Sequence, residues 1–220
     1  MTVRSRLPKI VALAMLPAIL LGGCRSKGDL VVDEGVGVTA VRTPCPAVGV
    51  PDYTGDITLF RQPGDVTQAN LDVVATITNV RSQCSLGSAK VVTQVGFDVL
   101  ARRTDTRGAR EVVLPYFVTV LRGGTAVTSK RVGSVTLSFA DGQERAQARG
   151  QGSSSIDRAE ATLPEDVRRR IVRKRKSGEA DAAVDPLSEP DVKAAVTRAT
   201  FEVLVGFQLD QRQLAYNATR

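Results

Sequence analysis

The sequence predicts a mainly β protein, an antiparallel β-sandwich with a two-helix insertion before its last strand. Between residues 57 and 139, short apolar runs that mostly alternate with polar residues are joined by glycine and aspartate turns. Residues 163–197 instead carry helix-start signals and a helical spacing of apolar residues. The strongly alternating run at 201–209 then predicts a strand that completes the sandwich.

Three strands are expected in the first half of this domain. They cover residues 57–60, 71–80 and 91–101, and residues 85–88 are predicted to form the turn between the last two. The inward-facing residues should be the alternating apolar ones, namely Leu71, Val73, Ala75, Ile77, Val91, Val95, Phe97 and Val99.

Two longer strands should follow. Residues 112–121 are apolar on both faces, which is typical of a covered strand, and Pro115 indicates that one edge is unpaired at that point. Residues 126–139 form the next expected strand, where a shift in the apolar phase near Gly133 predicts a bulge.

The start of the domain is expected to be irregular. Residues 44–51 contain three prolines, each of which removes a backbone donor, so we predict a loop held by Cys45. Residues 24–43 are polar and glycine-spotted, which favours a flexible tether, and this leaves residues 44–220 for the sandwich domain.

Two helices are expected between residues 163 and 197. Thr162 and Glu165 have capping-box spacing, with proline in the first turn, and Val167 and Ile171 follow four residues apart. A second helix should begin at residues 188–191, after an acidic, alanine-rich linker at 177–186. One face of that helix should carry the apolar residues Val192, Ala195 and Val196.

The first 23 residues have the composition of a signal peptide. Arg4, Arg6 and Lys9 precede an apolar run at 10–21, which is too short and too interrupted for a membrane-spanning helix. The run ends in the sequence Leu-Gly-Gly-Cys at residues 21–24.

This tripartite pattern resembles the lipobox of bacterial lipoproteins. The resemblance implies cleavage after Gly23, acylation of Cys24 and stable anchoring by two or three acyl chains. Arg25 stands where an aspartate would imply retention in the inner membrane, so the resemblance implies the outer membrane, with the chain facing the periplasm. The cell surface and the inner membrane are the alternatives. The competing interpretation of the motif is an ordinary signal peptide that leaves Cys24 as a thiol.

Charge and motif content bear on catalysis. The 220 residues include 30 basic and 23 acidic ones, and the signal peptide holds three of the bases, so the mature chain has 27 bases against 23 acids. The sequence has no histidine and no GxSxG, SxxK or phosphate-loop motif, so we expect no enzyme activity and no cofactor.

Cys45 and Cys84 are the cysteines that remain after Cys24. Export to an oxidising compartment predicts a disulfide between them, which would close a loop of about 40 residues and stabilise the fold by about 4 kcal/mol. Two unrelated thiols are the alternative. A zinc site is disfavoured, because the chain lacks histidine and CxxC spacing.

Residues 168–176 contain seven basic side chains. They predict contact with an anionic partner, which in a cell envelope means lipid head groups, phosphorylated lipopolysaccharide or an acidic protein rather than nucleic acid. The alternative is a solvated helix face neutralised by Glu165, Asp166, Glu179 and Asp181 of the same chain. The seven residues are Arg168, Arg169, Arg170, Arg173, Lys174, Arg175 and Lys176.

Residues 75–80, ATITNV, resemble a strand-ending phrase of bacterial immunoglobulin-like and fibronectin-like envelope modules. The resemblance implies a sandwich but no functional residues, and the tryptophan typical of antibody domains is missing. A lipocalin-like barrel is the main competitor, although it requires more long strands than the sequence offers.

Two classes of function are compatible with these observations. One is a non-catalytic envelope module that binds a protein or a surface, and the other is a carrier of a small or lipidic ligand in the space between sheet and helices. A carrier should have a large apolar pocket lined by inward residues of several strands, whereas a docking module should have a filled core and an exposed patch.

Overall fold

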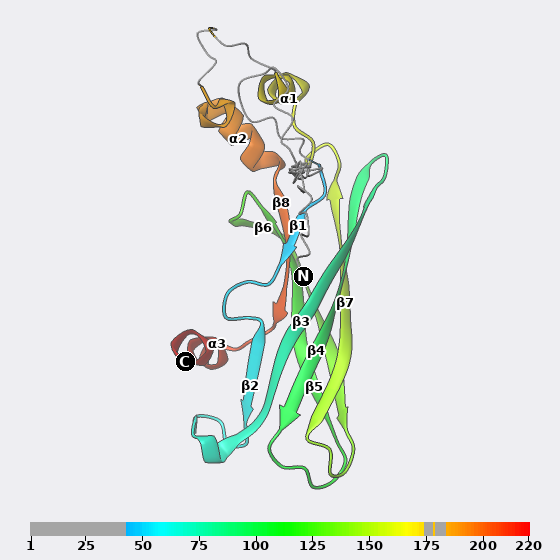
Figure 1. Ribbon diagram of the computed structural model, residues 1–220, viewed down its shortest axis with the longest axis vertical. Coiled ribbons are helices and arrows are strands. Elements are labelled where there is room, and N and C mark those ends of the chain that lie inside the picture. The colour runs from blue at the N-terminus through cyan, green and yellow to red at the C-terminus, as the bar shows by residue number, and fades with distance from the viewer. Residues whose placement is uncertain (1–42, 174–177, 179–183) are drawn as a thin grey trace, which may run out of the picture. The chain divides into compact units, whose positions relative to one another are not determined.

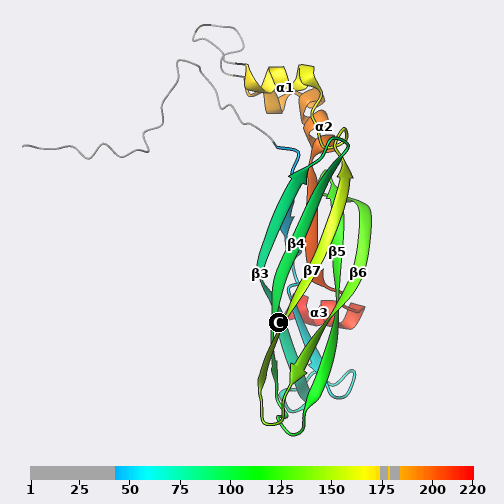
Figure 2. The ribbon, with the colours of Figure 1, turned by 90° about the vertical axis from the view of Figure 1, so that its right-hand side faces the viewer.

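Two four-stranded sheets pack face to face in the computed structural model, which describes residues 43–173, 178 and 184–220 (Figures 1 and 2). The strand orders are β1-β8-β5-β6 and β2-β3-β4-β7. The pairs are antiparallel except for β1 with β8, so the predicted antiparallel sandwich is confirmed. The strands are β1 (Ala47–Gly49), β2 (Asp56–Phe60), β3 (Leu71–Leu86), β4 (Lys90–Arg103), β5 (Arg110–Arg122), β6 (Ala126–Phe139), β7 (Arg145–Asp157) and β8 (Phe201–Phe207).

Three α-helices accompany the sheets. Helices α1 and α2 lie between β7 and β8 in the chain and pack at one end of the sheets, whereas α3 lies beside β2 (Figure 1). The helices are α1 (Glu165–Val172), α2 (Pro190–Ala199) and α3 (Gln211–Thr219), and short 3-10 turns occupy Gln68–Asn70 and Pro186–Ser188.

The core lies between the two sheets and is built from alternate residues of their strands. Val73 and Val99 of one sheet and Leu137, Val203 and Phe207 of the other are fully buried. All the predicted inward residues of β3 and β4 are buried except Leu71, which is half-buried. The alternation therefore predicted the buried faces of these strands correctly.

Tyr116 of β5 joins the two sheets. Its ring packs edge-on against Phe97 at 5.0 Å, and its hydroxyl donates to the Gln151 carbonyl of β7 at 2.6 Å. The ring crosses Gly133 so closely that a Cβ there would lie 2.7 Å from Tyr116 Cζ. Gly133 is thus required for packing, and the predicted bulge at this position is wrong, because the register with β5 is regular there. The bulge lies instead near Thr128, opposite Val120 and Leu121.

Two other predictions near β1 and β3 need correction. Residues 47–49 are an edge strand and not part of a loop, because the prolines flank this short segment rather than interrupt it. β3 runs on to Leu86, so the turn falls at residues 87–89, two residues later than predicted. Pro115 fits its prediction only in part. It lies one residue beyond the last pair with β8, Tyr116 with Phe207, but its carbonyl still accepts from the Gln208 amide at 2.9 Å.

Helix α3 was not predicted, although its start has a recognisable signal. The Asp210 carboxylate accepts from the Gln213 amide, and the Gln213 side chain accepts from the Asp210 amide, which makes a capping box. Farther along the helix, the buried Asn217 side chain donates to the carbonyls of Tyr53 and Asp56 at 2.8 Å each. These bonds fasten the end of the chain to the turn before β2.

Candidate functional site at the helical end

A groove with a volume of about 560 Å³ lies where α1 and α2 meet the ends of β1 and β8. We call it the helix groove. Apolar side chains of both helices line it, including Ile171 of α1 and Val196 of α2, and so does Leu163, which precedes α1. Phe201 of β8 lines it from the sheet. The groove therefore occupies the space between sheet and helices, and not the space between the two sheets.

Helix α1 forms the first wall of this groove. Val167 and Ile171 are buried, as their spacing predicted, but the predicted capping box is absent. The Thr162 hydroxyl donates to the Arg158 carbonyl instead, and Pro164 is the N-cap, whose carbonyl accepts the first helical hydrogen bond from Arg168. Because the Pro164 ring offers no side-chain acceptor, the acidic first turn is what favours this helix start.

Helix α2 forms the second wall and packs against α1. Val192 and Ala195 are buried and Val196 is half-buried, so the predicted apolar face is confirmed. Together with Val167 and Ile171 they make a small apolar cluster that is separate from the core of the sandwich. A cluster of this size contributes much less to stability than the main core, so we infer that the two helices are the first part of the domain to open.

Part of the basic run is neutralised within the fold. The Arg168 guanidinium makes two hydrogen bonds to Glu165, at 2.7 and 2.8 Å. Arg170 reaches across to α2, where it pairs with Asp191 at 2.6 Å and with Glu189. The prediction named Glu165 but missed the other two acids, which lie about twenty residues away in the sequence.

These ion pairs define a pH range for the helical end. Hydrogen bonds from Arg168 lower the pKa of Glu165 from its ordinary 4.5, and those from Arg170 lower the pKa of Asp191 from 3.8. A carboxylate whose pKa falls on folding stabilises the fold above its unfolded pKa, and this stabilisation is lost as the pH falls through the folded pKa. The pairs are therefore intact throughout the neutral range.

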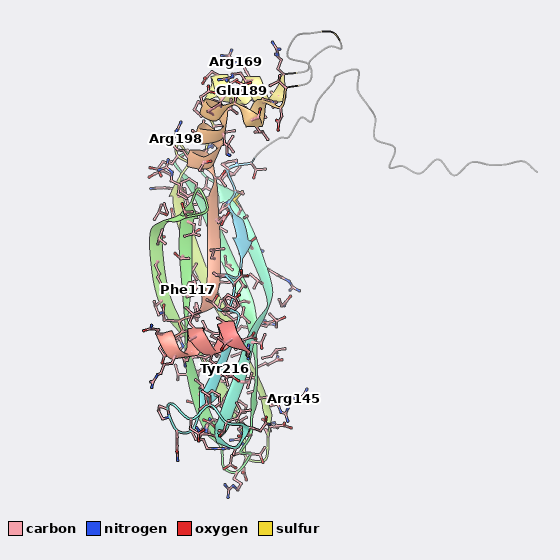
Figure 3. All side chains as sticks on the ribbon, turned by 90° about the vertical axis from the view of Figure 1, so that its left-hand side faces the viewer. Phe117, Arg145, Arg169, Glu189, Arg198 and Tyr216 are labelled. Carbon is pink, nitrogen blue, oxygen red and sulfur yellow. A yellow bond between two sulfur atoms is a disulfide. The ribbon has the colours of Figure 1, made fainter. Side chains whose placement is uncertain are left out.

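Three exposed cations at this end have no hydrogen-bonding or ion-pair partner for their side chains among the residues that the structure describes. They are Arg169 of α1 and Lys193 and Arg198 of α2. Figure 3 labels Arg169 and Arg198. Arg173 is exposed and does have a partner. Lys174, Arg175 and Lys176 lie outside the described residues, as do Cys24, Glu179 and Asp181.

The disulfide between Cys45 and Cys84 is confirmed, with the two Cα atoms 6.0 Å apart. Cys45 precedes β1 in one sheet and Cys84 lies near the end of β3 in the other, so the bond ties the two sheets together. Cys45 also lines the helix groove, as does Arg168. The structure thus brings the predicted disulfide and the first residue of the basic run to one site.

Two further charged residues line the groove, and neither was predicted as functional. Arg158 follows β7 and donates to the Gly87 carbonyl at 2.9 Å, and Glu202 is half-buried on β8. In the described part of the chain, neither has a partner of opposite charge. No local pattern distinguishes them from other surface charges in the sequence, so only the fold identifies them.

No family model, curated protein or solved structure matches this chain. Within residues 43–173, 178 and 184–220, no three cysteine or acidic side chains are grouped in a way that could hold a metal ion. No helix in this part of the chain is long and apolar enough to cross a membrane.

Proposed function

We propose that the protein is a non-catalytic, membrane-anchored envelope lipoprotein whose helical end contacts an anionic surface. The observation that carries the proposal is the set of three exposed cations, Arg169, Lys193 and Arg198, whose side chains make no hydrogen bond or ion pair with the described residues. Two other arginines of α1 do form ion pairs, Arg168 with Glu165 and Arg170 with Asp191, so the fold neutralises some cations at this end and not others. Unpaired like charges near one another repel unless an anion is close, and an anionic membrane or lipopolysaccharide surface provides it.

The membrane anchor in this proposal is the acylated Cys24. The proposal gives the protein no enzyme activity, no cofactor and no nucleic-acid partner. Eighteen residues, 25–42, separate it from the first described residue. Fully extended, they reach at most about 60 Å, so the domain stays near the bilayer. We place it at the outer membrane facing the periplasm, with the cell surface and the inner membrane as alternatives.

Cys24 should incorporate a fatty-acid analogue such as alkyne-palmitate during growth. The Cys24→Ala variant should incorporate none and should remain unprocessed or become soluble, because the lipid on Cys24 is its route to the membrane. Label is detected by coupling to a fluorophore after membrane fractionation. Wild-type protein that carries no label, or that is soluble after cell breakage, would refute the anchor.

The proposal also includes an immunoglobulin-like type for the sandwich. Two packed antiparallel sheets and a chain that returns to the sandwich after α2 support an immunoglobulin-like module with a helical insertion at 163–197. The order β2-β3-β4-β7 differs from the ABED and CFG sheets of constant-type immunoglobulin domains, so the likeness is in the packing of two sheets rather than in strand order.

Replacing Arg169, Lys193 and Arg198 by glutamine should weaken binding of the unit Val36–Arg220 to anionic vesicles by about a hundredfold. Each cation near an anionic surface contributes about 1 kcal/mol, and the attraction decreases with added salt as the Debye length falls below about 10 Å. Thermal melting should barely change, because these side chains are exposed. Vesicle flotation measures the binding.

The matched control replaces Arg81, Arg131 and Arg145 by glutamine, which removes the same charge from strands β3, β6 and β7. These arginines are also exposed and without partners in the described part of the chain, and Arg145 lies at the other end of the sheets from α1 (Figure 3). Equal losses in both variants would show that only net charge matters, and an unchanged affinity of the first variant would reject the docking surface.

A lipidic-ligand carrier is the second candidate function. The helix groove favours it, because its volume falls within the usual range of 300–1,000 Å³ for ligand sites and most of its lining residues are apolar. It differs from the expected carrier pocket in one respect: helices and strand ends line it, rather than the inward residues of several strands.

A further inference from the structure

We propose that the helix groove binds a single-chain phospholipid with a zwitterionic head group, such as lysophosphatidylethanolamine. This inference rests on the second candidate function above and names its ligand class. It is carried by two unneutralised charges of opposite sign, Arg158 and Glu202, that line one largely apolar groove.

The walls of the groove suit an acyl chain. Leu163, Ile171, Val172 and Val196 come from the helical segment, and Phe201 comes from β8. Phe201 is itself buried, with 4% of its surface exposed, so this wall is fixed by the core of the sandwich. A chain that covers these residues gains about fourfold in affinity for each methylene removed from water.

Arg158 is positioned to bind a phosphate. One of its Nη atoms donates to the Gly87 carbonyl at 2.9 Å, which holds the guanidinium beside the β3–β4 turn. The other guanidinium donors have no partner in the described residues. An arginine with donors available is the side chain best suited to phosphate, because its planar fork can make two parallel hydrogen bonds. Arg168 also lines the groove, but Glu165 already neutralises it.

Glu202 supplies the complementary charge. It lies on the outer face of β8, half-buried, and its partners across the strands are Ala47 and Leu121, neither of which is charged. A partly desolvated carboxylate favours a cation nearby and disfavours a second anion. The ammonium of an ethanolamine head group satisfies this requirement, whereas a purely anionic head group places like charges together.

The position of the groove favours a lipid over a peptide. Its rim begins at Thr43 and Pro44, the first described residues, which follow directly on the proposed tether. The tether keeps the groove within about 60 Å of the bilayer. A lipid ligand therefore needs no separate delivery to reach the site.

The test uses the full-length protein in membranes from expressing cells and a lysophosphatidylethanolamine with a photoactivatable group in its acyl chain. After irradiation, cross-linked peptides are identified by mass spectrometry. Cross-links should concentrate in residues 158–172 and 196–202.

The Arg158→Gln variant should reduce them at least about tenfold, since it removes a charge-assisted phosphate contact. The Arg145→Gln variant, the matched control on β7, should leave them unchanged. Unlabelled lysolipids with shorter chains should compete about fourfold less well for each methylene lost.

A second probe tests the head group. Lysophosphatidylglycerol with the same acyl chain should label wild type weakly, and the Glu202→Gln variant should gain labelling by this probe while it loses labelling by the ethanolamine probe. The control variant Glu111→Gln, on β5, should behave like wild type.

Three results would overturn the proposal. They are cross-links that spread over the strands, cross-linking that neither groove variant changes, and groove labelling that is equal for the two head groups. Vesicle flotation of Arg158→Gln should fall by at most about fivefold, far less than in the triple variant of Arg169, Lys193 and Arg198, so failure here is distinguishable from failure of the docking function.

Discussion

Replacing Arg103 by methionine should lower the free energy of unfolding by about 3 kcal/mol or more. Arg103 is 1% exposed at the end of β4, and it donates to four backbone carbonyls at 2.7–2.9 Å. Its guanidinium also lies over the Phe139 ring at 5.2 Å. Methionine keeps most of the packing but no donor. The carbonyls are those of Gln143, Gly108, Thr106 and Ala140.

The size of this effect depends on which of the four carbonyls still accept another hydrogen bond when the Arg103 guanidinium is removed. Thr106 and Ala140 keep backbone donors, from Gly142 and Gln143, but the other two carbonyls lose the donor that Arg103 supplies. A hydrogen bond from a charged donor contributes about 1.5–3 kcal/mol, so loss of the bonds to these two carbonyls accounts for the expected effect. Lysine at position 103 should be intermediate, because a single ammonium cannot span four carbonyls from two loops.

Arg102 is the matched control for Arg103. It is the preceding residue on β4, points to the opposite face and pairs with Glu144 in an exposed salt bridge. The Arg102→Met variant should lose less than about 1 kcal/mol. Urea denaturation measures both variants, and equal losses would show that the buried position of Arg103 has no special role.

Removing the disulfide should cost up to about 4 kcal/mol. The bond joins residues 39 apart, and the chain-entropy model gives about this value for a loop of that length. The double variant Cys45→Ser, Cys84→Ser should therefore unfold at lower denaturant concentration. Among the strands, β1 should be the first to detach, because only three residue pairs, all with β8, connect it to its sheet.

The local and global effects of the disulfide can be separated by hydrogen exchange. Amides of β1 should exchange faster in the double variant at denaturant concentrations where β3 and β4 are still protected. Reduction of the wild-type protein under native conditions serves as the control and should reproduce the effect. A change in stability below about 1 kcal/mol would mean that the β1–β8 pairing alone holds this edge.

The main features of the fold could be predicted because they are local. Alternation at 71–80 and 91–101 identified the buried faces of β3 and β4, and the spacing of Val167 and Ile171 identified the apolar face of α1. The strands β1 and β7 were missed. The pairing partner of β1 lies about 150 residues away in the sequence, and the glycines and serines at 150–155 in β7 have the composition of a loop. Gly133 was misinterpreted because a glycine that admits an aromatic ring has the same sequence signature as one at a bulge.

The candidate site could be predicted only in part. A run of bases is visible in the sequence, but which of its members are neutralised depends on Glu189 and Asp191, which the packing of α2 brings to Arg170. Lys193 was not singled out, since it stands alone among apolar neighbours. Arg102 and Arg103 are adjacent and identical in the sequence, yet one is exposed and the other buried.

The central claim is that the helical end, and not the sheet surface, contacts an anionic membrane. Hydrogen exchange of the full-length protein on vesicles tests this most directly. With anionic phospholipid, amides of α1 and α2 should exchange more slowly than with neutral phospholipid, and added salt should remove the difference. The same comparison should leave the strands of both sheets unchanged. Protection confined to the strands, or equal exchange of α1 and α2 on the two kinds of vesicle, would contradict the account.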